Sequence, residues 1–294
     1  MRKTIRKATL VITIGILLFP AIAMGGTDIS HTDDGFKLES DDHWIKIGGT
    51  LMWDIDSASA GYWDAEAEDE EESWRTHSEV RRARLTIKTK ITEDWRAKLQ
   101  YELAEADASD TVKDAYVQYR GWRYVDIIAG QSKEPFGLEA MTSSKNLAFI
   151  ERSMVSDAFR PGRHIGVQLN ADGKRWIGLL GVYEAQNREA DGDTYAVSGR
   201  LGVSPWKTGA GFFHLGVSGS CRDYDGEVFE IKASAEIHTA DNMVHSAEID
   251  TDYLVLYGGE TAFGLGPFSL QGEYMQADLY ALEEDEDVAF DGYY

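Results

Sequence analysis

Strict alternation of polar and apolar residues over neighbouring segments is the feature that most constrains how this chain folds. In the run RRARLTIKTKI, Arg82, Arg84 and Lys88 share one phase, and Leu85 and Ile87 share the other. The run WRAKLQYEL repeats the alternation, and only the residues TED separate the two runs. Because successive side chains of a β-strand point to opposite faces, the two runs are predicted to form an antiparallel hairpin.

The same alternation recurs along most of the chain. It is found in WIKIGGTLMWDI, KDAYVQYR, YVDIIAG, HIGVQLNA, WIGLLGVYEA, YAVSGRLGV, GFFHLGVSGS, VFEIKASAEI, YLVLYGGETAF and FSLQGEYMQADL. Together with the hairpin, these segments predict about twelve strands and an all-β fold. The connections alternate between short turns and longer polar loops, and this regularity weakens after Ala235.

Alternation alone does not choose between a soluble sandwich and a membrane barrel, because both have one polar and one apolar face. Three features favour a transmembrane antiparallel β-barrel: long charged side chains on one face of neighbouring strands, aromatic residues near strand ends, and an export signal. The aromatic residues are Trp53, Trp63, Trp74, Trp95, Trp122, Tyr124, Trp176 and Trp206.

The export signal lies at the N-terminus, where four cations precede an apolar run over residues 8–19 and small residues lead to Ala23. This is the layout of a secretory signal peptide, and the run is shorter than the ~20 residues of a spanning helix. We expect a signal peptide over residues 1–23, an N-terminal periplasmic segment over 24–43 and a barrel domain over 44–294. The four cations are Arg2, Lys3, Arg6 and Lys7.

The charge of the chain is strongly acidic but unevenly distributed. Without the four cations of the signal peptide, 25 basic residues face 51 acidic ones, a net charge of −26. This charge excludes a general nucleic-acid binder. Residues 77–163 hold 15 basic and 13 acidic residues, whereas the rest of the mature chain holds 10 and 38. The basic side chains are therefore gathered in one third of the chain.

The stretch KEPFGLEAMTSSKNLAFIERS interrupts the strand pattern at residues 133–153. Pro135 and Gly137 predict a bend, and a helical turn capped by a hydroxyl is expected near Ser143 or Ser144. In that turn Leu147 and the Phe149–Ile150 pair would pack toward the wall of the barrel. A segment of this kind can leave the wall and lie in the lumen.

The run GQSKEPFGLEAMTSSKNLAFIERSMVSDAFRPGRHIGV closely resembles the hallmark segment of the phosphate-selective porin O and P family of bacterial outer membranes. The resemblance extends through RRARLTIKTKITEDWRAKLQYELA, KDAYVQYRG, YAVSGRLGVSPW, FFHLGVSGS and GPFSLQGEYM, from about Val80 onward. It implies a barrel of sixteen strands, usually a trimer, whose third extracellular loop folds inward as a constriction loop.

Two features depart from the family pattern. About twelve strands are predicted and the chain stops at AFDGYY, which implies either a C-terminal truncation or a smaller barrel; we expect the truncation. The arginine ladder that guides anions in the best-known members has no counterpart after Arg163, where only Arg200, Arg222 and Lys232 are scattered along the chain.

Basic residues of the loop and of neighbouring strands are the candidate anion-binding groups. A ring of cations in a narrow pore focuses positive potential, and Arg binds oxyanions bidentately. The alternative for each residue is a salt bridge that anchors the loop to the wall. The candidate pore-lining residues are Arg82, Arg84, Lys133, Lys145, Arg152, Arg160 and Arg163, with further wall contacts from Lys88, Arg96, Lys98 and Arg120.

The sequence thus predicts an outer-membrane porin that passes small anions such as phosphate or other oxyanions. Expected partners are outer-membrane lipid, lipopolysaccharide and two further copies in a homotrimer. The alternatives are a general or sugar-permeable porin, and a secreted soluble hydrolase using carboxylates such as Glu102 and Glu139. Because no metal-ligand spacing, G-x-S-x-G motif or phosphate loop occurs, no enzyme activity, metal or cofactor is expected. The acidic runs DAEAEDEEES and EEDED are expected to be solvated loops, or to bind divalent cations that bridge to lipopolysaccharide.

Overall fold

The computed structural model describes residues 28–32, 35–59, 74–104, 111–185, 194–234, 236–281 and 287–294. The predicted signal peptide, the run DAEAEDEEES and most of EEDED lie outside these ranges. The chain divides into two compact units, one formed by Met1–Asp54 and Val80–Ser132 and the other by Ile55–Glu79 and Lys133–Tyr294. Among the described residues, no helix is both long and apolar enough to span a membrane.

The first unit is built from antiparallel strands that pair in chain order. They are β1 (Asp28–Thr32), β2 (Gly35–Ser40), β3 (His43–Ser59), β4 (Trp74–Lys90), β5 (Trp95–Glu102), β6 (Val112–Tyr119) and β7 (Asp126–Lys133), with the outer ends of β3 and β4 assigned to the second unit. The predicted hairpin around TED is confirmed, with Arg84 opposite Glu102 and Lys90 opposite Arg96.

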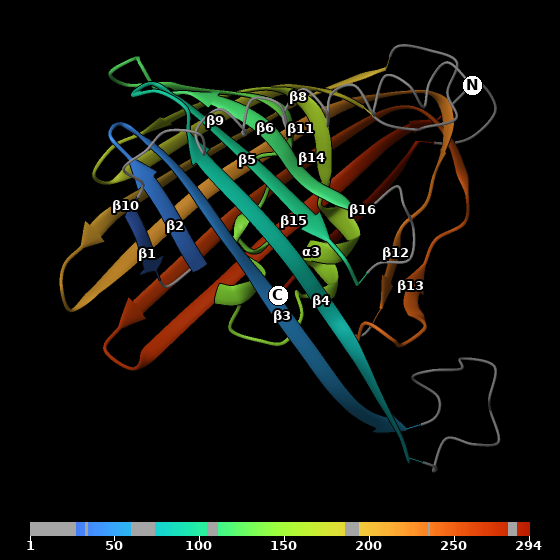
Figure 1. The fold of residues 1–294 in the computed structure, drawn as a ribbon. Helices are drawn as coiled ribbons and strands as arrows, with labels where there is room; N and C mark the ends of the chain where they lie inside the picture. Colours follow the sequence, from blue (N-terminus) through green and yellow to red (C-terminus); the bar gives the residue numbers. More distant parts are fainter. Residues whose placement is uncertain are drawn as a thin grey trace, which may run out of the picture. The chain divides into compact units, whose positions relative to one another are not determined.

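The second unit holds a sheet in the order β8-β9-β10-β11-β14-β15-β16, whose long strands β10, β11, β14 and β15 lie side by side (Figure 1). Its strands are β8 (Arg163–Asp172), β9 (Trp176–Glu184), β10 (Tyr195–Lys207), β11 (Gly211–Phe229), β14 (Ile249–Leu265), β15 (Phe268–Ala281) and β16 (Val288–Tyr293). The connection from β7 to β8 carries three short helices: α2 (Leu138–Met141), η3 (Ser144–Asn146) and α3 (Met154–Phe159).

The predicted wall strand VFEIKASAEI is wrong. β11 ends at Phe229, and the following residues form β12 (Lys232–Ser234), which pairs with β13 (Asn242–His245) in a separate two-stranded sheet. Glu236 has a φ of +58°, a left-handed conformation that interrupts an extended chain. The sequence analysis also missed β1, β2, β13 and β16, which are short. β1 and β2 lie within residues 24–43, and the periplasmic location of that segment stays a prediction.

On β10 the polar side chains are buried and the apolar side chains are exposed, which is the reverse of the pattern in a soluble protein. Ser198 and Arg200 are 0% and 6% exposed, whereas Leu201 and Val203, in the opposite phase, are 62% and 47% exposed. β11 repeats this arrangement. In a soluble sandwich the apolar phase faces the core, whereas in a membrane barrel it faces lipid. The ambiguity left by the alternation is therefore resolved in favour of a barrel wall.

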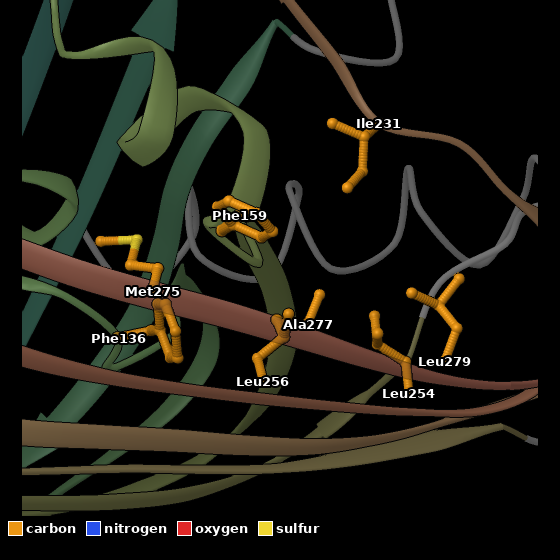
Figure 2. Packing of buried hydrophobic residues seen from close by; sticks show 8 residues of the cluster. All are labelled: Phe136, Phe159, Ile231, Leu254, Leu256, Met275, Ala277 and Leu279. Atoms are coloured by element: carbon orange, nitrogen blue, oxygen red, sulfur yellow. The ribbon is translucent and has the colours of Figure 1, made fainter. Parts of the chain in front are cut away.

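The connection from β7 to β8 packs against the face of this wall that is turned away from lipid. The contact there is a cluster of apolar side chains (Figure 2). Phe136 and Phe159 come from the connection, Ile231 comes from the segment between β11 and β12, and β14 and β15 supply the other side chains. The buried members of the cluster are Phe136, Phe159, Ile231, Leu254, Leu256, Met275, Ala277 and Leu279. We call residues 134–162 the constriction loop, since they lie on the face of the wall opposite to the lipid-facing phase.

The prediction that Leu147, Phe149 and Ile150 pack on the wall is wrong. Phe149 and Ile150 are 78% and 65% exposed, and Leu147 is only half-buried. Phe136 takes their place: it is fully buried in the cluster with Met275 of β15, next to the bend at Gly137. The predicted helical turn at Ser144 is confirmed as η3, but its N-cap residue Ser143 makes no side-chain cap; the hydroxyl cap is that of Ser153 on α3.

Candidate functional site

The bend that starts the constriction loop needs glycine at position 137. Gly137 has a φ of +67°, and a Cβ there would lie 2.8 Å from the Cε atom of Met275. The Gly137 N–H donates to Ser218 Oγ on β11 over 3.3 Å. The backbone therefore approaches the wall more closely than any larger residue would allow.

The foot of the loop is held by a buried polar cluster centred on Glu134. Its carboxylate accepts two hydrogen bonds from Arg222 Nη1 of β11, at 2.8 and 2.9 Å, and one from Ser198 Oγ of β10. His164 Nδ1, at the start of β8, contacts the same carboxylate. Three strands of the wall thus converge on one loop residue.

The electrostatics of this cluster favour the charged carboxylate. Burial of Glu134 opposes ionisation, but the hydrogen bond with His164 and the charge of Arg222 outweigh it and lower the pKa of Glu134 from 4.5 to about 2. A buried carboxylate that is ion-paired and hydrogen-bonded stays ionised at neutral pH. The foot is therefore a fixed ionic anchor under ordinary conditions.

A second buried ion pair lies further along the same face of the wall. Arg200 of β10 donates from Nη2 and Nε to the two oxygens of Glu260 on β14, at 2.5 and 2.9 Å. His214 Nε2 of β11 lies 2.6 Å from Glu260 Oε1. Arg200 and Arg222, described above as scattered, hence point to one face, but each is bound by a carboxylate.

Two of the predicted anion-binding cations instead bind the loop's own backbone. Lys133 Nζ donates to the carbonyl oxygens of Ala140 and Thr142, at 2.5 and 3.3 Å. Arg152 donates to the carbonyls of Glu139 and Thr142, at 3.0 and 2.9 Å. These contacts are the anchoring alternative that the sequence left open for each residue.

The other predicted loop cations are more accessible. Lys145 is exposed on η3, and Arg163 is half-buried at the start of β8. Arg160 pairs with Asp157 three residues earlier, with a shortest N–O distance of 2.6 Å, and both side chains are partly exposed. An exposed pair of this type holds its partners weakly.

In the first unit, the predicted wall residues lie on β4 and β5 and directly after β6, and three of them pair with carboxylates. Arg84 Nε lies 2.7 Å from Glu102, Lys98 Nζ lies 2.5 Å from Asp114, and Arg120 Nε lies 2.9 Å from Asp126. Arg82 is 3% exposed, and its Nη1 lies 3.4 Å from the sulfur of Met52. The expectation that the loop cations meet Arg82 and Arg84 stays a prediction.

Four cations nevertheless face one another on β4 and β5. Lys88 lies directly opposite Lys98, and Lys90 lies directly opposite Arg96. Arg96 Nε is buried and has no hydrogen-bond partner within the described part of the chain. Like charges placed opposite one another destabilise a sheet. The positive charges of this basic quartet must therefore be balanced by water, carboxylates or a bound anion. Asp114 supplies part of this balance through Lys98.

The sequence analysis missed the residues that hold the loop. His164, Ser198, Glu260 and His214 were not singled out, and Arg200 and Arg222 were treated as scattered cations. The polar residues on β10, β11 and β14 share one phase, and this phase could have identified them. A polar residue in the phase opposite to lipid faces the lumen or the loop. The pairing itself was not readable, because Arg222 and Glu134 are 88 residues apart.

Comparison with known proteins identifies the family. The family model described as phosphate-selective porin O and P matches residues 54–294. Porin O of Pseudomonas aeruginosa is 25% identical over 299 aligned residues, which cover 92% of this chain and 65% of that protein. The chain thus spans less than two thirds of this relative's length.

The fold resembles that of solved outer-membrane proteins. In-vitro folded OmpT, an outer membrane protein of Vibrio cholerae, matches with a TM-score of 0.55 and 11% identity, over 87% of this chain and 71% of that chain. A trimer form of the same protein also gives 0.55, over 86% and 71%. At this identity the likeness concerns the fold alone. The match over residues 54–294 shows that the chain belongs to the phosphate-selective porin O and P family, and so is an antiparallel β-barrel protein of the bacterial outer membrane and not an enzyme.

Proposed function

We propose that this chain forms a passive diffusion channel for small anions, such as phosphate or other oxyanions. The observation that carries the proposal is the basic quartet of β4 and β5, in which Lys88 lies opposite Lys98 and Lys90 lies opposite Arg96. Cations gathered between low-dielectric walls raise the local concentration of anions.

The constriction loop supports the same proposal. It lies on the wall face opposite to lipid and carries the exposed Lys145 and Arg160, and the half-buried Arg163 follows it at the start of β8. We assign these three cations, with the quartet, Arg84 and Arg120, to contact with the solute. Lys133 and Arg152 are assigned to holding the loop, because Lys133 donates to the carbonyl of Ala140 and Arg152 donates to the carbonyl of Thr142. The buried Arg82 is assigned to the wall.

The partners of the chain are proposed on the same basis. The lipid-facing phase of β10 and β11 would contact outer-membrane lipid and lipopolysaccharide. A homotrimer is proposed because the family resemblance implies one, and the solved trimer form of OmpT shows that a related fold assembles in this way.

A second candidate is a general or sugar-permeable porin, and one observation favours it. Arg84, Lys98 and Arg120 each pair with a carboxylate, so much of the positive potential of the wall is neutralised. Such a wall would pass anions only slightly better than cations or neutral solutes.

Reversal potentials in planar bilayers separate the two candidates. The purified chain is placed in a salt gradient, and phosphate is then added to chloride to test for competition. The anion channel predicts a reversal potential on the anion side and a chloride current that phosphate reduces. A reversal potential near zero with sugar permeation supports the general porin, a cation-side potential overturns the anion proposal, and absence of any conductance overturns the channel itself.

A further inference from the structure

Glu273 of β15 is a buried carboxylate that binds the constriction loop and not a cation. It is 4% exposed, and its Oε2 and Oε1 atoms accept the backbone N–H groups of Leu138 and Glu139, each at 2.7 Å. Among the described residues, no salt bridge to Glu273 is found. Its direct partner across the sheet is another acid, Glu260, which is bound to Arg200. The loop backbone thus supplies two of the hydrogen bonds that this carboxylate accepts.

Tyr294, the residue after β16, completes the arrangement. Its hydroxyl donates to Glu273 Oε1 over 2.5 Å, and its N–H donates to the Glu273 carbonyl over 3.1 Å. Three donors therefore converge on one carboxylate: two from the loop and one from the residue that follows β16.

The close approach at Gly137 lets these bonds form. A Cβ at this position would lie 3.0 Å from Glu273 Oε2, so the glycine brings the loop backbone against the carboxylate. Glu139 then extends the contact inward, because its own buried carboxylate accepts the N–H and Oγ–H groups of Ser153, both at 2.9 Å. Glu273 holds the start of α2, and α2 holds the start of α3.

We propose that Glu273 and Tyr294 are positioning residues that hold the inner part of the constriction loop against the wall and so set the width of the channel. This inference rests on the proposed function, since width matters only in a channel. The sheet itself does not need these side chains, because β14 pairs with β15 through the backbone from Tyr253 to Leu265. The foot of the loop at Glu134 would remain, since it has its own ion pair with Arg222.

The two anchors differ in chemistry. At Glu134 opposite charges are paired, and both strand and loop lose a partner if the pair is broken. At Glu273 the donors are two backbone N–H groups and a phenol, which are uncharged. Loss of Glu273 leaves these donors free to bind water in the lumen, so the inner loop can move away from the wall while the foot stays in place.

The test compares single-channel conductance among full-length variants. Glu273→Ala removes all three hydrogen bonds, Glu273→Gln keeps an amide oxygen that accepts one loop N–H, and Tyr294→Phe removes only the phenol bond. Asp278→Asn is the matched control, because it changes an acid to an amide on the same strand in the opposite phase. Liposome swelling with sugars of increasing size measures the width independently.

We expect conductance and the sugar size limit to rise in the order Tyr294→Phe, Glu273→Gln, Glu273→Ala, with Asp278→Asn equal to the starting protein. All variants should keep the faster gel migration of a folded barrel. Conductance of folded Glu273→Ala equal to that of the starting protein overturns the inference. If Glu273→Ala does not fold, the conductance of Tyr294→Phe tests the inference. A conductance of Tyr294→Phe equal to that of the starting protein then overturns the inference.

A second readout does not require a channel. Release of the inner loop should speed trypsin cleavage after Lys145, which lies on η3 between the two held helices. If the starting protein shows no conductance, the proposed function fails, and the cleavage rates still decide the role of Glu273. Equal cleavage rates in the starting protein and in Glu273→Ala would then show that Glu273 does not hold the inner loop.

Discussion

The carboxylate of Glu134 lies 2.8 Å from Arg222 Nη1 and joins the start of the constriction loop to a strand 88 residues later in the chain. Both side chains are buried. This pair explains how a loop with little regular structure of its own is fixed to a barrel wall: the loop supplies the anion, and the wall supplies the cation and two hydroxyl or imidazole partners.

Glu134→Gln is expected to destabilise the folded protein strongly. The change leaves Arg222 buried without a counter-charge, and breaking one side of a buried ion pair costs about 3–5 kcal/mol. Thermal unfolding of the barrel in detergent, followed by the shift in gel migration, measures the loss. Asp157→Asn is the control, because it breaks the exposed pair with Arg160 and should cost less than about 1 kcal/mol. Equal effects of the two changes would contradict the anchoring role.

The same pair gives a pH dependence with a defined sign. The pKa of Glu134 is lowered in the folded state from 4.5 to about 2. A lowered pKa means that the folded state favours the ionised form, so the stabilisation is fully present above about 4.5 and is lost as the pH falls from there toward 2. Thermal unfolding measured across this window should show a declining midpoint. In Glu134→Gln the decline should be shallower, and an unchanged slope would count against the assignment.

The apolar contact of the loop gives a third prediction. Phe159→Ala removes a side chain that is 6% exposed in the cluster with Leu256 and Met275, and the loss of a buried phenylalanine costs about 3–5 kcal/mol. Phe149→Ala is a matched control on the same loop, because Phe149 is 78% exposed. Its effect should fall within about 0.5 kcal/mol. Protease sensitivity of the loop should rise only in Phe159→Ala.

The strands were predictable because alternation is a local signal. The hairpin of β4 and β5 could be read directly, since its turn is three residues long and both strands keep one phase. The segment after Phe229 could not, because Ile231 is buried in the cluster with Phe136 and Phe159, and β12 packs against α3 and not within the wall. A local pattern does not distinguish these two causes of an apolar residue.

The candidate site was predictable in residue type but not in partners. Lys133 and Arg152 were identified as cations of the loop, yet their acceptors are carbonyl oxygens, which carry no signature in the sequence. Phe136 was overlooked in favour of Phe149 and Ile150 because the choice depends on the direction in which the chain leaves Gly137. That direction is set by the close approach to Met275, a residue 138 positions later.

Asp114→Asn is expected to increase the preference of the channel for anions. Asp114 neutralises Lys98, and its removal leaves the basic quartet less compensated. The reversal potential in a salt gradient should shift toward the anion side, and the shift should shrink at high ionic strength because salt screens the charges. Lys98→Gln should shift it the other way. If both substitutions shifted the potential in the same direction, the quartet would not be the source of selectivity.

Substitutions in the loop separate solute selection from anchoring. Lys145→Gln removes an exposed charge, whereas Lys133→Gln removes a charge whose ammonium binds the carbonyls of Ala140 and Thr142. If Lys133 mainly anchors the loop, Lys133→Gln should speed proteolysis of the loop and broaden the single-channel current levels. Lys145→Gln should instead leave proteolysis unchanged and weaken anion preference. Equal loss of anion preference in both variants, with an intact loop in each, would show that Lys133 also contacts the solute, and its assignment to anchoring alone would then be wrong.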